Sequence, residues 1–234
     1  MMNLTLSKYG IEPNISISET HFFTLSIENK AYLLSVLSEL RTQTEDGKEG
    51  TFHLLLNDKE LNLEKSVSII FDFTDIDFNS KKITNQIIKK FTDFLTFGEQ
   101  LENLSKLESL VLNMAEDFRI SSGLNVEYDT VMNGTNLAKV CSLRIADRGR
   151  SLLERLCEYV SLICDLKPLK LFVLVFGKQF LIEHDLQVLY KYCADIGVRL
   201  LVIEGVDKTE RLPNEMRLII DESLCSFTQG HDEI

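Results

Sequence analysis

The chain has 234 residues, of which 44% are hydrophobic, 26% are charged and three are prolines. These values exclude a disordered chain and fit one large domain or a domain with an insertion. The formal net charge of −11 argues against a simple basic nucleic-acid binder, because clustered Lys and Arg are needed to neutralise phosphates. A local basic surface can still meet DNA, since salt screens charge within about 10 Å.

The N-terminus has no basic segment followed by a long apolar run, and no window approaches the ~18 apolar residues of a membrane span. We therefore expect a cytoplasmic protein without membrane contact. The five cysteines form no C-x-x-C pair and the four histidines show no metal-ligand spacing. Zinc and catalytic histidine chemistry therefore have little support.

Short strands around one helix are predicted for the first eighty residues. Apolar and β-branched residues at 14–18 and 22–27 predict a pair of strands. Leucines at helical spacing follow Asn29 and predict a helix that begins there. Two further strands are expected at 52–56 and 67–73, the second of them buried.

The next ninety residues show helical periodicity. Asn79 or Ser80 is expected to cap a helix whose apolar stripe begins with Ile83. After an interruption at Gly98, a second stripe with a repeat near 3.5 residues runs over 101–118. We favour core within the chain for this second stripe, and a seam between copies is the alternative that the sequence leaves open.

A turn is predicted at 121–123, and a capping box of Ser151 and Glu154 predicts the start of another helix. The apolar runs at 169–176 and 198–204 predict buried strands joined by a helix, which implies a parallel pair.

The order of these elements predicts a discontinuous α/β fold. Residues 1–79 and 167–234 are expected to form an α/β head, because strands occur at both ends of the chain. Residues 80–166 are expected to project from it as a long inserted helical leg.

Three aspartates, Asp72, Asp75 and Asp77, follow the strand predicted at 67–73. A strand that ends in Asp72 imitates P-loop nucleotidases, but the phosphate loop G-x-x-x-x-G-K-[ST] is missing from the sequence. The nearest segment, Val175–Gln179, lacks the first glycine and the Ser or Thr. In an extended chain Asp72 faces away from the other two, so we favour an acidic turn. A metal-dependent nuclease or nucleotidase that uses the three aspartates is the alternative.

Acidic residues also flank the turn predicted at 121–123. They are Glu116, Asp117, Glu127 and Asp129. Carboxylates brought together at a hinge suit Ca²⁺, which accepts six to eight oxygen ligands. The chain has no EF-hand loop, so a solvated acidic face is the interpretation that these residues favour on their own.

A group of basic residues with few acids between them follows. The group consists of Lys139, Arg144, Arg148 and Arg150. Such residues either contact phosphates or form a solvated helix face, and the sequence leaves both interpretations open.

Three segments together resemble the CRISPR-associated Csn-two family, which serves spacer acquisition in type II-A systems. They are KSVSIIFDFTDIDFNSKKITNQI at 65–87, NVEYD at 125–129, and LFVLVFGKQFLIEHDLQVLYKYCADIGVRLLVIE at 171–204. The resemblance spans nearly the whole chain. It implies an α/β head related to P-loop folds but without working nucleotide motifs, and a long helical leg.

The resemblance also implies a function. Members of the family form homotetrameric rings that bind calcium near the hinge between head and leg and bind ends of double-stranded DNA. They act beside the CRISPR integrase complex and the RNA-guided effector nuclease and are not enzymes. Carried over, the calcium ligands would be the four acids named above, and the DNA-binding residues would be the four basic residues. We expect binding that is independent of DNA sequence and steeply dependent on salt.

Overall fold

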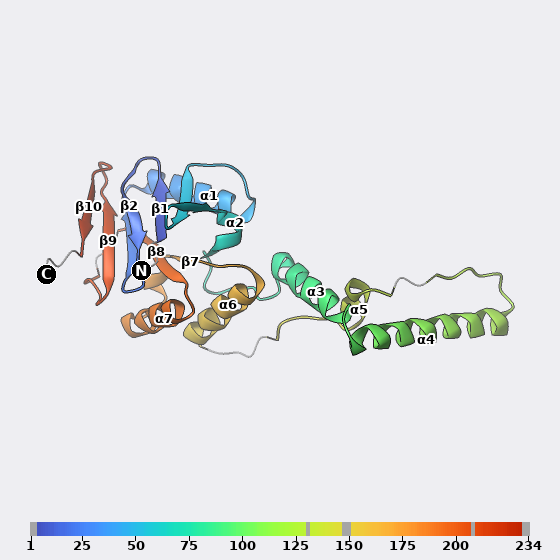
Figure 1. The fold of residues 1–234 in the computed structure, drawn as a ribbon. Coiled ribbons are helices and arrows are strands. Elements are labelled where there is room, and N and C mark those ends of the chain that lie inside the picture. Colours follow the sequence, from blue (N-terminus) through green and yellow to red (C-terminus); the bar gives the residue numbers. More distant parts are fainter. Residues whose placement is uncertain (1–3, 130–131, 147–150, 207–208, 231–234) are drawn as a thin grey trace. The chain divides into compact units, whose positions relative to one another are not determined.

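The computed structural model describes residues 4–129, 132–146, 151–206 and 209–230, and its described part contains two sheets and seven α-helices (Figure 1). The chain divides into two compact units. We call residues 1–76 with 149–234 the α/β unit, and residues 77–148 the helical unit. The mixed α/β class that the sequence predicts is confirmed.

A six-stranded sheet forms the centre of the α/β unit. Its strands lie in the order β10-β9-β3-β8-β7-β6, and only β10 runs antiparallel to its neighbour. β3 and β8 are buried along their whole length, as strands covered on both faces must be. The strand bounds are β3 Phe22–Ile27, β6 Val67–Ile70, β7 Leu171–Val175, β8 Arg199–Glu204, β9 Glu215–Ile220 and β10 Ser226–Gln229.

A second, four-stranded sheet is antiparallel throughout and has the order β2-β1-β4-β5. In β2 the residues Ile11, Ile15 and Ile17 are buried while those between them are exposed, so one face of this sheet points to the core. Two helices accompany it, α1 with its N-cap Asn29, and the short α2. The bounds are β1 Leu4–Lys8, β2 Ile11–Ile17, β4 Phe52–Leu56, β5 Lys59–Leu61, α1 Lys30–Glu45 and α2 Leu63–Ser66.

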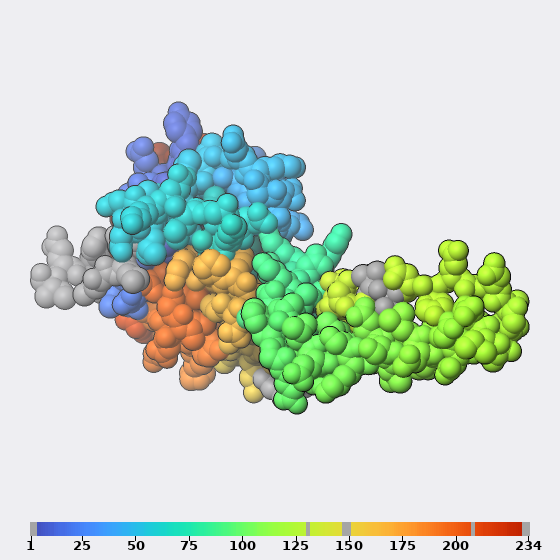
Figure 2. All heavy atoms as spheres, turned by 45° about the vertical axis from the view of Figure 1, so that its right-hand side comes forward, coloured from blue at the N-terminus to red at the C-terminus, as the bar shows by residue number. Residues whose placement is uncertain are grey.

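Alternate side chains of the six-stranded sheet pack into two different layers. Leu25 and Leu201 belong to one buried cluster with α1 and the four-stranded sheet. On the other face, Phe172 contacts Tyr159 of α6 (Leu152–Leu166), with ring centroids 6.3 Å apart. Helices α6 and α7 (Glu183–Asp195) therefore cover the face opposite α1 (Figure 1). Figure 2 shows the blue and cyan N-terminal residues packed against the orange C-terminal residues in this unit.

The pairing predicted for the first two strands is wrong. Residues of β2 and β3 do form strands, but β2 pairs with β1, whereas β3 pairs in parallel with β8 and β9. The burial pattern explains this, because β2 has one buried face and β3 is buried at all six positions. Strand β6 ends at Ile70, three residues before the predicted end.

Helix α6 lies in the α/β unit, although we expected residues 80–166 to form the helical leg. Its residues Leu156, Val160 and Ile163 are buried along one face, and the helix packs beside α7. The helical unit therefore ends near residue 148 rather than at 166.

The capping box predicted at the start of α6 is present. The Glu154 N–H donates to Ser151 Oγ at 3.3 Å, and the Ser151 N–H donates to Glu154 Oε2 at 3.0 Å. The sequence signal for this helix start was correct because the two residues satisfy each other's backbone groups locally.

The helical unit contains α3 (Lys81–Leu95), α4 (Glu99–Ser122) and the short α5 (Gly134–Val140). Ser80 caps α3, since its Oγ accepts the Ile83 N–H at 3.4 Å. Asn79 has another role. Its side chain donates to the Ile145 carbonyl at 3.0 Å and accepts the Ile145 N–H at 2.8 Å, which joins the start of the unit to its end.

Helix α5 begins in close contact with α3. A Cβ atom added to Gly134 would lie 2.5 Å from the Cα atom of Thr92, which no side chain tolerates. The absence of a side chain at Gly134 therefore allows the two helices to touch.

The apolar stripe of α4 does not form core within the described residues of this chain. No described residue of α4 is buried, and Leu110, Met114 and Phe118 are 56%, 64% and 57% exposed. The interpretation of residues 101–118 as core within the chain is therefore wrong. Residues of this kind on one helix form an exposed apolar surface that is available for contact with another chain.

Candidate nucleic-acid interface

Two of the four basic residues predicted to contact DNA are described, and both are exposed. Lys139 lies in the last turn of α5, and Arg144 lies in the segment that follows this helix. Arg148 and Arg150 lie outside the described residues. The structure therefore places an exposed basic pair next to the C-terminal end of α5.

A second basic group, which the sequence interpretation did not single out, lies on α3. We call it the α3 lysine face, and it consists of Lys81, Lys82, Lys89 and Lys90, all exposed. At 100° per residue the four lysines fall within about half of the helix circumference, and the apolar stripe with Ile83 fills the other half. Its sequence signal was KKITNQIIKK, in which two lysine pairs lie eight residues apart.

Charge is distributed unevenly along the chain. Residues 77–148 contain nine Lys and Arg against ten Asp and Glu, so the helical unit has a net charge of −1. The remaining residues carry the other −10 of the total of −11. Within the helical unit, α3 contains four lysines and a single acid, Asp93. The helical unit is therefore the less acidic of the two units.

The three aspartates after β6 form a turn rather than a metal site. Asp72 Oδ1 accepts hydrogen bonds from the Thr74 N–H (2.8 Å), the Thr74 hydroxyl (2.6 Å) and the Asp75 N–H (3.3 Å). Asp77 Oδ1 accepts the Asn79 N–H at 2.7 Å. The three bonds from backbone N–H groups are of the Asx-turn type, so the acidic-turn interpretation is supported.

Replacing Asp72 with Ala is expected to lower stability without removing any hydrolytic activity. The hydrogen bonds from the Thr74 hydroxyl and N–H lower the pKa of Asp72, so their stabilisation is present above the unfolded pKa and is lost as pH falls through the folded one. Asp72→Ala should therefore lower the melting temperature at pH 7 and do so less in acid. Asp75→Ala is the matched control, and a nuclease activity lost in Asp72→Ala would contradict the turn.

The connection between β3 and α1 is too short for a phosphate-binding loop. Between β3 and α1 lie only Glu28 and Asn29, whereas a P-loop needs eight residues that wrap phosphates with backbone N–H groups. The segment that comes nearest to the phosphate-loop motif follows β7 and contains Lys178, which forms bonds within the protein. Its ammonium donates to Glu215 at 2.6 Å and its backbone N–H donates to Glu204 at 2.8 Å. Lys178 is therefore committed to the protein itself.

Glu215 is the centre of a buried ionic cluster. Its residue is 2% exposed, and its carboxylate accepts bonds from Lys178 Nζ, Arg217 Nε at 2.8 Å and the Thr24 hydroxyl at 2.6 Å. The Leu212 N–H adds another at 2.8 Å. Burial raises the pKa of Glu215, but these hydrogen bonds outweigh it and the pKa is lowered overall. The cluster joins β3, β9 and the segment after β7 and has a structural role.

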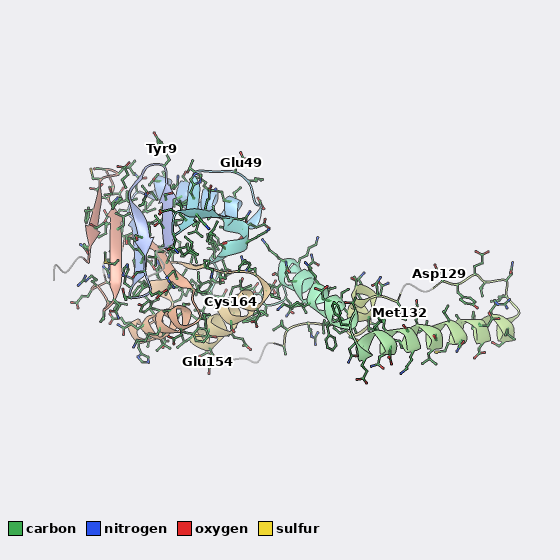
Figure 3. All side chains as sticks on the ribbon, in the orientation of Figure 1. Tyr9, Glu49, Asp129, Met132, Glu154 and Cys164 are labelled. Carbon is green, nitrogen blue, oxygen red and sulfur yellow. The ribbon has the colours of Figure 1, made fainter. Side chains whose placement is uncertain are left out.

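The four acids predicted as calcium ligands are not brought together. Glu116 and Asp117 lie near the end of α4, whereas Glu127 and Asp129 lie on the segment that follows it. Figure 3 labels Asp129 on this segment. The guanidinium of Arg119 donates to both oxygens of Glu116, at 2.6 and 2.8 Å, and the Tyr128 hydroxyl donates at 2.6 Å.

These hydrogen bonds, from Arg119 first and Tyr128 second, lower the pKa of Glu116 to about 2. The same bond to Glu116 raises the pKa of Tyr128. In the part of the chain that the structure describes, no three His, Cys, Asp or Glu side chains could together hold a metal ion. The four acids, as arranged in one chain, therefore do not fit a calcium site.

These features define a mixed α/β protein whose central sheet is interrupted in sequence by a helical unit and whose sequence contains no phosphate loop. No helix among the described residues is long and apolar enough to cross a membrane. The family model described as CRISPR-associated protein (Cas_Csn2) matches residues 43–224, which is 182 of the 234 residues, and the chain belongs to this family. The resemblance drawn from the sequence is thereby confirmed. No curated protein matches the chain.

Proposed function

We propose that the protein is a non-enzymatic factor that binds the ends of double-stranded DNA during CRISPR spacer acquisition. Family membership over residues 43–224 carries this proposal, because the family is CRISPR-associated. The basic residues of the helical unit support it, since they concentrate positive charge in a chain whose net charge is −11. Binding to phosphates alone is independent of sequence, as capture of arbitrary invading DNA requires.

The absence of enzymatic activity is part of the proposal. A P-loop needs a glycine-rich loop that the sequence lacks, and Asp72 is used in a turn. We propose that the sheet is related to P-loop folds but serves as a scaffold, because the sequence lacks the phosphate loop and Lys178, in the segment nearest to one, is bonded to Glu215.

We further propose that four copies form a ring. The exposed apolar stripe of α4 supports contact between copies, because such a surface is costly to leave in water. Four copies carry a formal charge of 4 × −11 = −44, which would repel DNA on the outside of the assembly. Basic residues of the helical unit would therefore need to face the DNA path. The expected partners in the cell are the CRISPR integrase complex and the RNA-guided effector nuclease.

Calcium dependence is proposed on family membership alone. The four acids of one chain do not form a ready site, and Glu116 would have to release Arg119 before it could bind an ion.

The proposal predicts a shift in the mobility of linear duplex DNA without any cleavage. The protein is mixed with linear and with closed circular DNA of one sequence, in Ca²⁺, in Mg²⁺ and with a chelator. We expect intact linear DNA in a slower band, less binding of the circle, and weaker binding with the chelator. Cleavage products in Mg²⁺ would contradict the proposal and favour the metal-dependent nuclease. Absence of every complex at low salt with Ca²⁺ would favour a protein-interaction module.

A further inference from the structure

The α3 lysine face differs from an ordinary solvated helix face. Solvent-exposed helices usually intersperse both signs of charge, and α4 does so with Glu102, Lys106 and Glu108 in succession. On α3 the four lysines share one half of the circumference with the neutral Asn85 and Gln86, and the single acid, Asp93, lies on the same half near the end of the helix. The result is a net charge of +3 on one helix of a chain with a net charge of −11.

The spacing of the lysines suits a nucleic-acid backbone. Lys81 and Lys90 are nine residues apart, which is about 14 Å along a helix axis at 1.5 Å per residue. One strand of a duplex advances about 3.4 Å per phosphate, so the face spans about four phosphates. Lys82 and Lys89, seven residues apart, lie within about 20° of each other around the axis and present two ammonium groups in line.

The neighbouring helix α5 carries one further exposed lysine. Helix α5 is seated directly against α3 through Gly134 and Thr92, and it carries the exposed Lys139 in its last turn. Because the helical unit joins its own start and end through Asn79 and Ile145, these two helices belong to one compact body. Lys139 therefore adds one positive charge to the compact body that contains α3.

We infer that the α3 lysine face binds the phosphate backbone of the duplex, as the main electrostatic contact of this chain with DNA. The inference rests on the proposed function. It differs from the sequence-based prediction, which assigned the contact to Lys139, Arg144, Arg148 and Arg150. It assigns the dominant contact to α3, which is the first helix after the turn that contains Asp72 and Asp77.

The inference is tested by the salt dependence of duplex binding. The test variant replaces the four lysines of the α3 lysine face with Gln in the full-length protein. The control variant replaces four exposed lysines of the α/β unit with Gln, which changes the net charge equally: Lys30, Lys59, Lys65 and Lys191. Circular dichroism confirms that both variants are folded, and the dissociation constant for a linear duplex is measured between 50 and 200 mM salt.

Each phosphate contact contributes about 0.9 to the slope of log K against log salt. The slope of the α3 variant should therefore be lower than that of the wild type by up to about 3.6, which is about 150-fold in affinity across this fourfold range of salt. The control variant should keep the wild-type slope to within about 0.5. An α3 variant whose slope equals that of the control overturns the inference. A wild-type protein that binds no duplex overturns the proposed function itself, so the two failures are distinguishable.

Discussion

Replacing Glu215 with Ala should be one of the most destabilising single substitutions in the α/β unit. The change leaves Lys178 and Arg217, whose side chains are 7% and 4% exposed, without the carboxylate that both contact. Removal of one partner from a buried ion pair typically costs about 3–5 kcal/mol, because the remaining charge is buried and uncompensated. This is a large part of the roughly 5–15 kcal/mol that stabilises a typical domain.

The test measures urea unfolding of the wild type, Glu215→Ala and Glu215→Gln at pH 7. Gln keeps the shape of the side chain and can still accept a hydrogen bond from the Thr24 hydroxyl. The free energy of unfolding of Glu215→Gln should therefore lie between those of the wild type and Glu215→Ala. Glu222→Ala removes an exposed carboxylate seven residues later and is the matched control. A cost for Glu215→Ala below about 1 kcal/mol, the size typical of an exposed ion pair, would show that the buried cluster does not stabilise the fold.

The pH dependence gives an independent check of the same cluster. The pKa of Glu215 is lowered in the folded protein, so its stabilisation is complete above the unfolded pKa and is lost as pH falls through the folded pKa. The difference in stability between the wild type and Glu215→Gln should therefore shrink as the pH is lowered. A difference that stays constant into the acid range would mean that the carboxylate is not the stabilising charge.

Features decided by a few neighbouring residues were predictable from the sequence. Asn29, Ser80 and Ser151 were expected to begin helices, and each accepts a backbone N–H at a helix start. The strand–helix–strand order of β7, α7 and β8 likewise predicted the observed parallel pair, because such a crossover fixes the direction of the second strand.

Features decided by distant partners were not predictable. β3 takes its neighbours from β8 and β9, which lie more than 170 residues later, so no local pattern indicates this pairing. Helix α6 has the same amphipathic character as a leg helix, and only its packing beside α7 assigns it to the α/β unit. Spacing also cannot show that the Tyr128 hydroxyl would bond to Glu116, because this contact spans a turn and an irregular segment.

Only part of the basic surface of the helical unit was predicted from the sequence, and distant partners are not the reason. The sequence search favoured a run of basic residues without acids, which led to Lys139 and Arg144. The lysines of α3 occur as two separated pairs, and they form one surface only when the helix period is applied to them. A search of each amphipathic helix for the charge on its polar face would have identified them.

Replacing the apolar stripe of α4 with polar residues should dissociate the proposed tetramer without unfolding the chain. The variant carries Leu110→Gln, Met114→Gln and Phe118→Gln. Covering the exposed part of each side chain contributes about 1–2 kcal/mol, so two copies contribute about 6–12 kcal/mol. Association costs about 4–15 kcal/mol, so the loss of this contribution is enough to reverse assembly.

Light scattering should give the wild type a mass near 107 kDa, four times the 26.8 kDa of one chain, and should give the variant a clearly smaller mass. Circular dichroism should not change, because none of the three side chains is buried within the described part of the chain. Ser109→Gln with Asn113→Gln changes the other side of α4 and should leave the mass at the wild-type value. A wild-type mass of 26.8 kDa would contradict the tetramer. A triple variant that remains four chains in size would place the contact between copies elsewhere than on α4, and the exposed stripe would then need another partner.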